Sequence, residues 1–399
     1  MSRDPLGDRP LLTARGSRVP HGSGFLARPH GSRPNGSAGW LRLDLGLLIG
    51  ALGLSLLGVV LVWSATRASV GSSAALRQLV ALGVGVAGAA ALTRVDVRSI
   101  RAAAPVVYVV AVLGLAAVVS PLGVTVNGSR SWLRLPGGFS LQPSELMKVA
   151  LAIGLAMLLA DRAERGLRQR HLDVVLAWVV AGIPVLLVLL QPDLGSALVL
   201  VAMSVVVIAA AGAPAVWTVG VLVAGTGAVA AAFLTPVLSG YQRNRLRAFL
   251  DPSLDPQGIG YQTRQVRLAI GSGGLDGQGL FAGRQTQGGF IPFQETDFVF
   301  SVTGEELGFL GAAGLVVILG FVVVRCLLVA RRADAFGRLV AVGVGVWFGV
   351  QAFENIGMNL GLMPVTGLPL PFVSSGGSSL IASWLALGLV GNVAAGARR

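Results

Sequence analysis

The 399-residue sequence is 54% hydrophobic and only 12% charged, and its mean hydropathy is +0.75. Soluble domains carry about 25% charged residues, so this composition excludes a soluble globular protein. The net charge of +13 does not indicate nucleic-acid binding, because the arginines lie mainly in loops between apolar runs. Those runs recur from Leu41 onward and approach the roughly 20 residues that cross a bilayer, which predicts an all-α, polytopic membrane protein.

The first 40 residues differ from the rest of the chain. They are rich in Arg, Pro, Gly and Ser and have no sustained apolar pattern, which predicts a disordered cytoplasmic tail. The segment lacks an apolar core of about 7–15 residues and is therefore not expected to be a signal peptide. Residues 41–399 are expected to form the membrane domain.

Ten apolar runs have the length of transmembrane helices. Their approximate bounds are 41–64, 74–93, 102–120, 143–160, 172–190, 194–212, 214–236, 300–329, 337–361 and 374–396. Arginines concentrate in the loops 94–101, 161–171 and 330–337, so the positive-inside rule places these loops and both termini in the cytoplasm. The connection 237–299, between the seventh and eighth helices, is then a long extracytoplasmic loop, where functional residues are expected.

Lys148 is the single lysine among 31 basic residues. It lies three residues after Glu145, on the same face of the fourth predicted helix. Two interpretations stay open at this point. The pair is either a structural ion pair between helices, or a charged wall of a polar cavity in which the compact ammonium faces an anionic group.

Two helix starts share a Gln-Pro-acid pattern. Gln142-Pro143-Ser144-Glu145 precedes the fourth predicted helix, and Gln191-Pro192-Asp193 precedes the sixth. Proline suits the first turn of a helix, but this preference does not account for the acids. The acids Glu145 and Asp193 therefore need another explanation.

The segment "GFIPFQETDFVFSVTGEELGF", residues 289–309, brings four acids to the start of the eighth predicted helix. Partial desolvation there makes Asp297 the strongest candidate for a general base. Glu295 is expected at the solvated interface. Glu305 and Glu306 lie deeper and are expected to cap backbone groups or to pair with an arginine.

The long loop and the last helices add further candidates. The glycine-rich stretch 269–289 is not preceded by a strand, so it does not predict a dinucleotide fold. Its glycines allow close approach to a bulky ligand, with loop arginines nearby for phosphate. Asn355 and Asn359, beside Glu354, are expected to be cavity walls, with hydrogen bonding between helices as the alternative. The pieces together predict an outward-facing polar cleft with a cationic lining, suited to an amphiphile with a phosphate head and a lipid tail.

Several motifs in order resemble one known family over residues 41–396. They are "NGSRSWL" (127–133), "QPSELMK" (142–148), "QPDLG" (191–195), "YQRNRLRAFLDP" (241–252), "GYQTRQVRLAIGSGGLDGQG" (260–279), "TDFVFSVTGEELG" (296–308) and "MPVTGLPLPFVSSGGSS" (363–379). The chain resembles the SEDS family (shape, elongation, division and sporulation proteins), and its elongation branch, RodA, more than its division branch, FtsW.

The resemblance implies a peptidoglycan glycosyltransferase of the plasma membrane that polymerises lipid II into glycan strands, with a class B penicillin-binding protein as partner. It places the family's catalytic aspartate at Asp297. Substrate contacts are expected from Lys148, Glu145, Arg130, Trp132, Gln142, Asp193, Arg243 and Arg264. The sequence contains no metal-binding motif, and the assistance of Mg²⁺ or Mn²⁺ stays open. The chain departs from the family pattern at Glu295, where many members have His, and at Ser375, where many have Tyr.

Overall fold

The computed structural model describes residues 44–126, 129–134, 140–234, 249, 251 and 258–396. The predicted tail and Arg243 lie outside this range. The helices are α1 (Leu45–Thr66), α2 (Ser73–Leu92), α3 (Val97–Val119), α4 (Pro143–Glu164), α5 (His171–Leu189), α6 (Leu194–Ala210), α7 (Ala215–Leu234), α9 (Ile259–Ser272), α10 (Arg284–Gln287), α11 (Val299–Glu306), α12 (Gly308–Ala330), α13 (Ala335–Leu360) and α14 (Gly377–Gly396).

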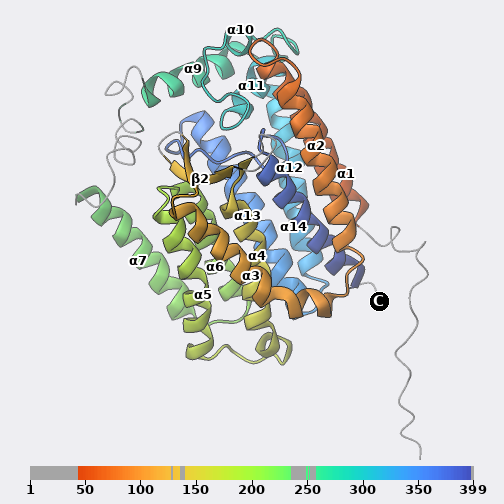
Figure 1. The fold of residues 1–399 in the computed structure, drawn as a ribbon, viewed down its shortest axis with the longest axis vertical. Helices are drawn as coiled ribbons and strands as arrows, with labels where there is room; N and C mark the ends of the chain where they lie inside the picture. The colour runs from red at the N-terminus through yellow and green to blue at the C-terminus, as the bar shows by residue number, and fades with distance from the viewer. Residues whose placement is uncertain are drawn as a thin grey trace, which may run out of the picture. The chain divides into compact units, whose positions relative to one another are not determined.

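The all-α class is confirmed, and the spanning helices follow the predicted apolar runs, whereas α9 and α10 lie within the connection 237–299 that was predicted as a loop (Figure 1). Among the described residues, eight helices are long and apolar enough to cross a membrane: α1 to α5 and α12 to α14. The apolar helix α6 is shorter, with 17 residues, and α7 is apolar over the part Ala215–Gly227 whose side chains are described. The chain is therefore a multi-pass membrane protein.

Three helices form the centre of the bundle. About four fifths of the apolar window is buried in α4 (83%) and α14 (78%), and two thirds in α13 (67%), whereas the other spanning helices bury 17% to 39%. The outer helices are apolar on the faces that contact lipid, so hydropathy alone does not separate the two groups. The side chains of Glu145 and Lys148 in α4, and of Gln351, Asn355 and Asn359 in α13, are accordingly fully buried.

Aspartates begin several helices. Asp44, Asp193 and Asp334 each accept a hydrogen bond from a backbone N–H in the first turn of α1, α6 and α13, at 2.8–3.1 Å. Such caps satisfy N–H groups that have no partner within the helix. The start of α4 instead carries Pro143 at its first position, where no N–H is needed.

The predicted eighth span, 300–329, is wrong in one respect: it is two helices, α11 and α12. The chain turns at Gly308, whose φ of +66° favours glycine. Glu305 accepts backbone hydrogen bonds from Gln285 and Thr286 at 2.7 and 2.9 Å, and so anchors α10 to α11. Glu305 was expected either to cap backbone groups or to pair with an arginine, and these contacts show the capping role. These contacts come from the preceding loop, so an apolar run alone cannot reveal the break.

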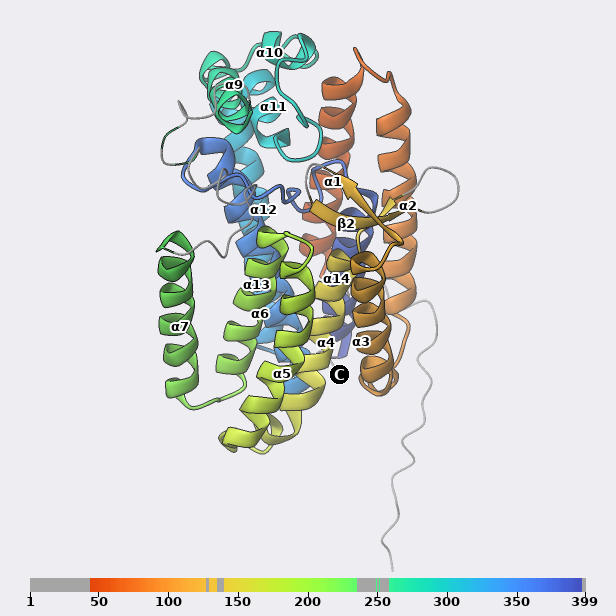
Figure 2. The same ribbon diagram turned by 60° about the vertical axis from the view of Figure 1, so that its left-hand side comes forward.

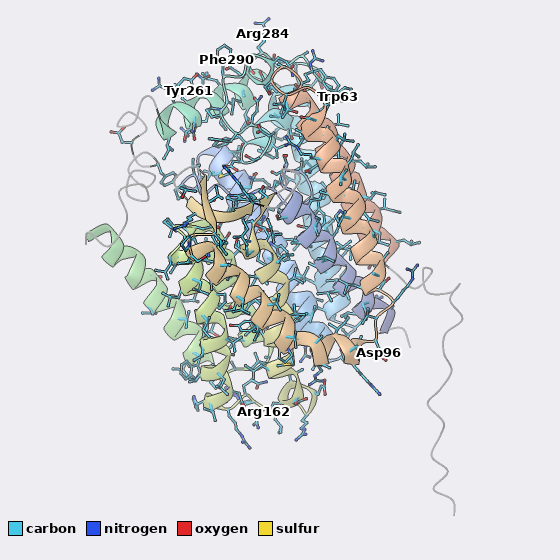
Figure 3. The ribbon with its side chains drawn as sticks, viewed as in Figure 1. Trp63, Asp96, Arg162, Tyr261, Arg284 and Phe290 are labelled. Carbon is cyan, nitrogen blue, oxygen red and sulfur yellow. The ribbon has the colours of Figure 1, made fainter. Side chains whose placement is uncertain are left out.

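A small sheet lies between α3 and α4 and was not predicted. Its strands are β1 (Gly123–Val126), β2 (Ser129–Arg134) and β3 (Ser140–Leu141), antiparallel in the order β1-β2-β3. Figure 2 shows it at the same end of the bundle as α9 to α11. Figure 3 places Arg162, in the last turn of α4, and Asp96, just before α3, at the opposite end from Tyr261 and Arg284; arginines concentrate near both of these positions. The positive-inside rule then makes the sheet end extracytoplasmic.

The close packing of α14 against α2 requires a glycine at position 388, and we expect a larger residue there to lower the thermal stability of the protein. A Cβ added there would lie 2.6 Å from the Cα of Ala89, so α14 would be pushed away from α2. Gly388→Ala should lower the melting temperature of the protein in detergent. Gly83→Ala is the matched control, because no atom lies within 4 Å of its Cβ position. The control should melt at or above the parent temperature, since alanine favours a helix by about 1 kcal/mol over glycine. Equal melting of the two variants would contradict the packing described.

Candidate active site

A polar cleft of about 200 Å³ opens at the extracytoplasmic end of the bundle. It is enclosed by β2, by the starts of α4 and α6, and by the irregular segments that precede α11 and α14. Four predicted site residues border it: Trp132, Gln142, Asp193 and Asp297. Six hydroxyl side chains share the lining: Ser129, Ser131, Thr296, Thr366, Ser375 and Ser379.

A tight turn presents Asp297 to the cleft. The backbone carbonyl of Phe293 accepts hydrogen bonds from the N–H groups of Thr296, Asp297 and Phe298 at 3.0–3.3 Å. Phe293 has a φ of +57°, which is unusual for a bulky residue and costs on the order of 1–3 kcal/mol. Its ring also borders the cleft. Strain of this kind persists where the surrounding structure fixes a functional geometry, here that of the half-buried Asp297.

The two Gln-Pro-acid turns meet in space. Asp193 accepts a hydrogen bond from the N–H of Ser196 at 3.0 Å through Oδ1, and Gln142 Nε2 donates to its Oδ2 at 3.4 Å. The backbone N–H of Gln142 donates to Ser378 Oγ at 3.0 Å. Asp193 therefore both caps α6 and contributes a second carboxylate to the cleft.

Lys148 and Glu145 form an ion pair that is fully buried. Lys148 Nζ donates to Glu145 Oε1 and to Gln351 Oε1, each at 2.7 Å, and lies 5.4 Å from the ring centre of Trp347. Both charged side chains have 0% exposure, and neither borders the cleft. Gln351 stands between them and the cleft, because its Nε2 donates to the carbonyl of Pro369, a lining residue, at 2.8 Å. This arrangement is that of the structural ion pair, and direct contact of Lys148 with substrate stays a prediction.

Two further predicted cations, Arg130 and Arg264, are also not among the residues that border the cleft. Arg130 Nε donates to the carbonyl of Gly123 at 3.1 Å, which ties β2 to β1. Arg264 is exposed on α9. No lysine or arginine is among the described residues that border the cleft, so the expected cationic lining is wrong for this part of the chain. The substrate contacts expected of Arg130 and Arg264 remain predictions, as does that of Arg243.

The asparagines match neither expectation in full, because their hydrogen bonds outside α13 go mainly to irregular segments and only the bond from the Ser301 N–H to Asn359 Oδ1 joins two helices. Asn355 and Asn359 are fully buried and donate hydrogen bonds to backbone carbonyls behind the cleft. Neither they nor Glu354 border it.

The sequence interpretation missed Gln78. This buried residue of α2 donates to the carbonyl of Ser374 at 2.9 Å and accepts from the N–H of Gly376 at 3.3 Å. The segment before α14 also contacts the turn that carries Asp297, since the N–H of Ser375 donates to the carbonyl of Glu295 at 2.8 Å. A lone glutamine within an apolar helix was the available signal, because polar groups inside a membrane are expensive.

The fold and the cleft define a polytopic membrane protein with a carboxylate-bearing site at the end of the bundle where the small sheet lies, and known proteins resemble this chain. A profile of the family described as "Cell cycle protein", comprising FtsW, RodA and SpoVE, matches residues 41–399. The chain therefore belongs to the FtsW/RodA/SpoVE family, and the SEDS resemblance is confirmed.

Similar proteins come from both branches of this family. A probable peptidoglycan glycosyltransferase FtsW of Trichlorobacter lovleyi is 38% identical, over 88% of this chain and 93% of the relative. The peptidoglycan glycosyltransferase MrdB of Escherichia coli is 34% identical, over 90% of this chain and 95% of the relative. The crystal structure of RodA from Thermus thermophilus is 33% identical in sequence with a TM-score of 0.66, over 89% of this chain and 97% of that chain. A chain of a solved peptidoglycan synthase complex is 35% identical with a TM-score of 0.74, and the match covers 90% of this chain and 100% of that chain. The RodA-like assignment stays a prediction.

Removing one partner of the buried ion pair should destabilise the fold. Lys148→Met leaves the Glu145 carboxylate buried without its cation, which should cost about 3–5 kcal/mol. Replacing both, as Lys148→Met with Glu145→Leu, should recover most of that loss. Unfolding of the purified variants in detergent measures both effects. A Lys148→Met variant as stable as the parent would show that the pair does not hold the bundle together.

Proposed function

We propose that this chain is a peptidoglycan glycosyltransferase that polymerises lipid II at the outer face of the plasma membrane. The observation that carries the proposal is Asp297, a half-buried carboxylate on the wall of a hydroxyl-rich cleft. The names of the similar proteins from two branches of the family support the same activity.

The cleft chemistry fits recognition of sugars. Hydroxyl, amide and carboxylate side chains offer hydrogen bonds to sugar hydroxyls, and the rings of Trp132 and Phe293 supply apolar surfaces. A pocket with a few placed polar groups and apolar walls is typical of a small-ligand site. The acceptor sugar at the end of the glycan substrate is the group we place here.

The reaction needs one base. The acceptor 4-hydroxyl attacks C1 of the donor sugar, a new C1–O bond forms, and the bond from C1 to the pyrophosphate oxygen breaks. Asp297 takes the hydroxyl proton, as the base of an inverting glycosidase does for water. The α-linked donor is thereby converted into a β-linkage, and undecaprenyl pyrophosphate leaves with the electron pair.

The charge of the leaving group has to be balanced outside the cleft lining. We assign this role to the arginines of the long loop, such as Arg264 and Arg243, since charge-assisted hydrogen bonds to phosphate are the strong ones. Among the described residues, no three His, Cys, Asp or Glu side chains come together as a metal site. Since Mg²⁺ is usually held by one or two carboxylates and several waters, the assistance of Mg²⁺ or Mn²⁺ stays open.

The partner proposed is a class B penicillin-binding protein. A polymerase makes uncrosslinked strands, and a transpeptidase must crosslink them. The solved chain with the TM-score of 0.74 is part of a peptidoglycan synthase complex that coordinates polymerization and crosslinking, which supports this pairing.

A lipid II flippase, the main alternative function, finds less support. A flippase needs a polar path through the bundle. Deeper in the bundle than the asparagines of α13, the centre is filled by the buried rings of Trp347, Phe348 and Phe372, whose neighbouring ring centres are 5.0–5.2 Å apart. This layer favours an enzyme that works from one side of the membrane.

Asp297→Asn should abolish polymerisation while keeping the fold. Asparagine has the shape of aspartate but cannot accept the proton, so we expect a loss of about 10²–10⁴-fold in the rate. The measurement is glycan polymer formed from lipid II by the purified protein, alone and with its partner. Asp276→Asn, on the exposed part of the same loop, is the matched control and should leave the rate unchanged. Full polymerisation by Asp297→Asn would refute the assignment of the base.

A further inference from the structure

One buried amide joins two walls of the cleft. Asn355 Nδ2 donates to the backbone carbonyl of Asp297 at 2.9 Å and to that of Leu368 at 2.7 Å. Asp297 lies on one wall, and Leu368 lies between Gly367 and Pro369, which border the cleft from the other wall. The side chain of Asn355 has 0% exposure and lies behind the cleft rather than in it.

The chemistry of the position explains the residue. A side-chain amide carries two N–H donors on one nitrogen, so a single asparagine can serve two acceptors at once. Both carbonyls belong to irregular segments that lie outside the helices. Buried carbonyls without a partner are costly. An apolar side chain here would take this donor from the Leu368 carbonyl and would leave the Asp297 carbonyl with Asn359 as its remaining side-chain donor.

A second asparagine one turn further along α13 completes the arrangement. Asn359 Nδ2 donates to the carbonyls of Asp297 at 3.2 Å and of Asn355 at 2.8 Å, and its Oδ1 accepts from the N–H of Ser301 at 3.2 Å. The start of α11 and the base segment are thereby both tied to α13. Because α13 is largely buried at the centre of the bundle, it is a rigid platform for the base.

We propose that Asn355 is a positioning residue of the glycosyl transfer: it sets the separation between the Asp297 segment and the wall at 366–369, and hence the distance from the base to the acceptor hydroxyl. The inference rests on the proposed role of Asp297. A misplacement of about 1 Å can cost about 10²-fold in rate. Since Asn355 makes no contact with the cleft, its loss should lower kcat and leave KM nearly unchanged.

The chain contains a matched control. Asn392 Nδ2 also bridges two backbone carbonyls, those of Leu92 and Val95, each at 2.7 Å. It is 5% exposed. Its partners lie beside Asp96, at the end of the bundle opposite the long loop in Figure 3. Asn392→Leu therefore removes two hydrogen bonds of the same kind, from a side-chain amide to backbone carbonyls, at a place far from the cleft.

The experiment compares Asn355→Leu, Asn392→Leu and Asp297→Asn in the full-length protein, with lipid II as substrate. We expect both leucine variants to lose similar amounts of melting temperature. Asn355→Leu should lose about 10–100-fold in kcat with KM within about threefold, whereas Asn392→Leu should keep kcat within about twofold. If Asn355→Leu does not fold, Asn355→Asp against Asn392→Asp gives the same comparison, because each acid keeps the side-chain size and offers at most one donor.

Each outcome bears on a separate claim. Equal kcat in the Asn355 and Asn392 variants would overturn the positioning role. If Asp297→Asn is inactive while Asn355→Leu is fully active, only the positioning inference fails. If Asp297→Asn is active, the base assignment fails whatever Asn355 does.

Discussion

Buried irregular backbone has to find hydrogen-bond partners inside the protein, and the cleft depends on this constraint. Two of its walls are formed by the segments that precede α11 and α14, whose carbonyls have no helical partners. Neutral amides on α2 and α13 supply the donors: Gln78 to Ser374, Gln351 to Pro369, and Asn355 to Leu368. Without these donors, the buried carbonyls would lose their hydrogen-bond partners, and the segments would not keep the positions that leave the cleft between them.

The same network separates the charges of the site. The single lysine is neutralised by Glu145 behind Gln351, so its charge supports the bundle rather than the lining of the cleft. The carboxylates of Asp297 and Asp193 face a lining of hydroxyl groups and aromatic rings instead. Such a surface suits a neutral sugar hydroxyl that has to lose a proton. The pyrophosphate is better served by the arginines of the extracytoplasmic loop.

The sequence was sufficient for the spanning helices and for four of the residues that border the cleft. Apolar runs located the helical segments, and Trp132, Gln142, Asp193 and Asp297 do meet in one cleft. The spacing of Glu145 and Lys148 predicted their pairing but not their depth, because burial depends on the helices that surround α4. The break at Gly308 depends on contacts from the loop before it, and the role of Gln78 depends on a partner 296 residues away. Contacts of this kind leave no periodic pattern in the sequence.

The most direct test of the account is a structure of the Asp297→Asn variant bound to lipid II and a short glycan acceptor. The central claim is that the base and the acceptor hydroxyl meet in this cleft. We expect the acceptor sugar between Trp132 and Phe293, with its 4-hydroxyl oxygen about 2.6–3.2 Å from the amide introduced at position 297. An acceptor sugar bound outside the cleft, with its 4-hydroxyl beyond hydrogen-bond reach of this position, would contradict the claim.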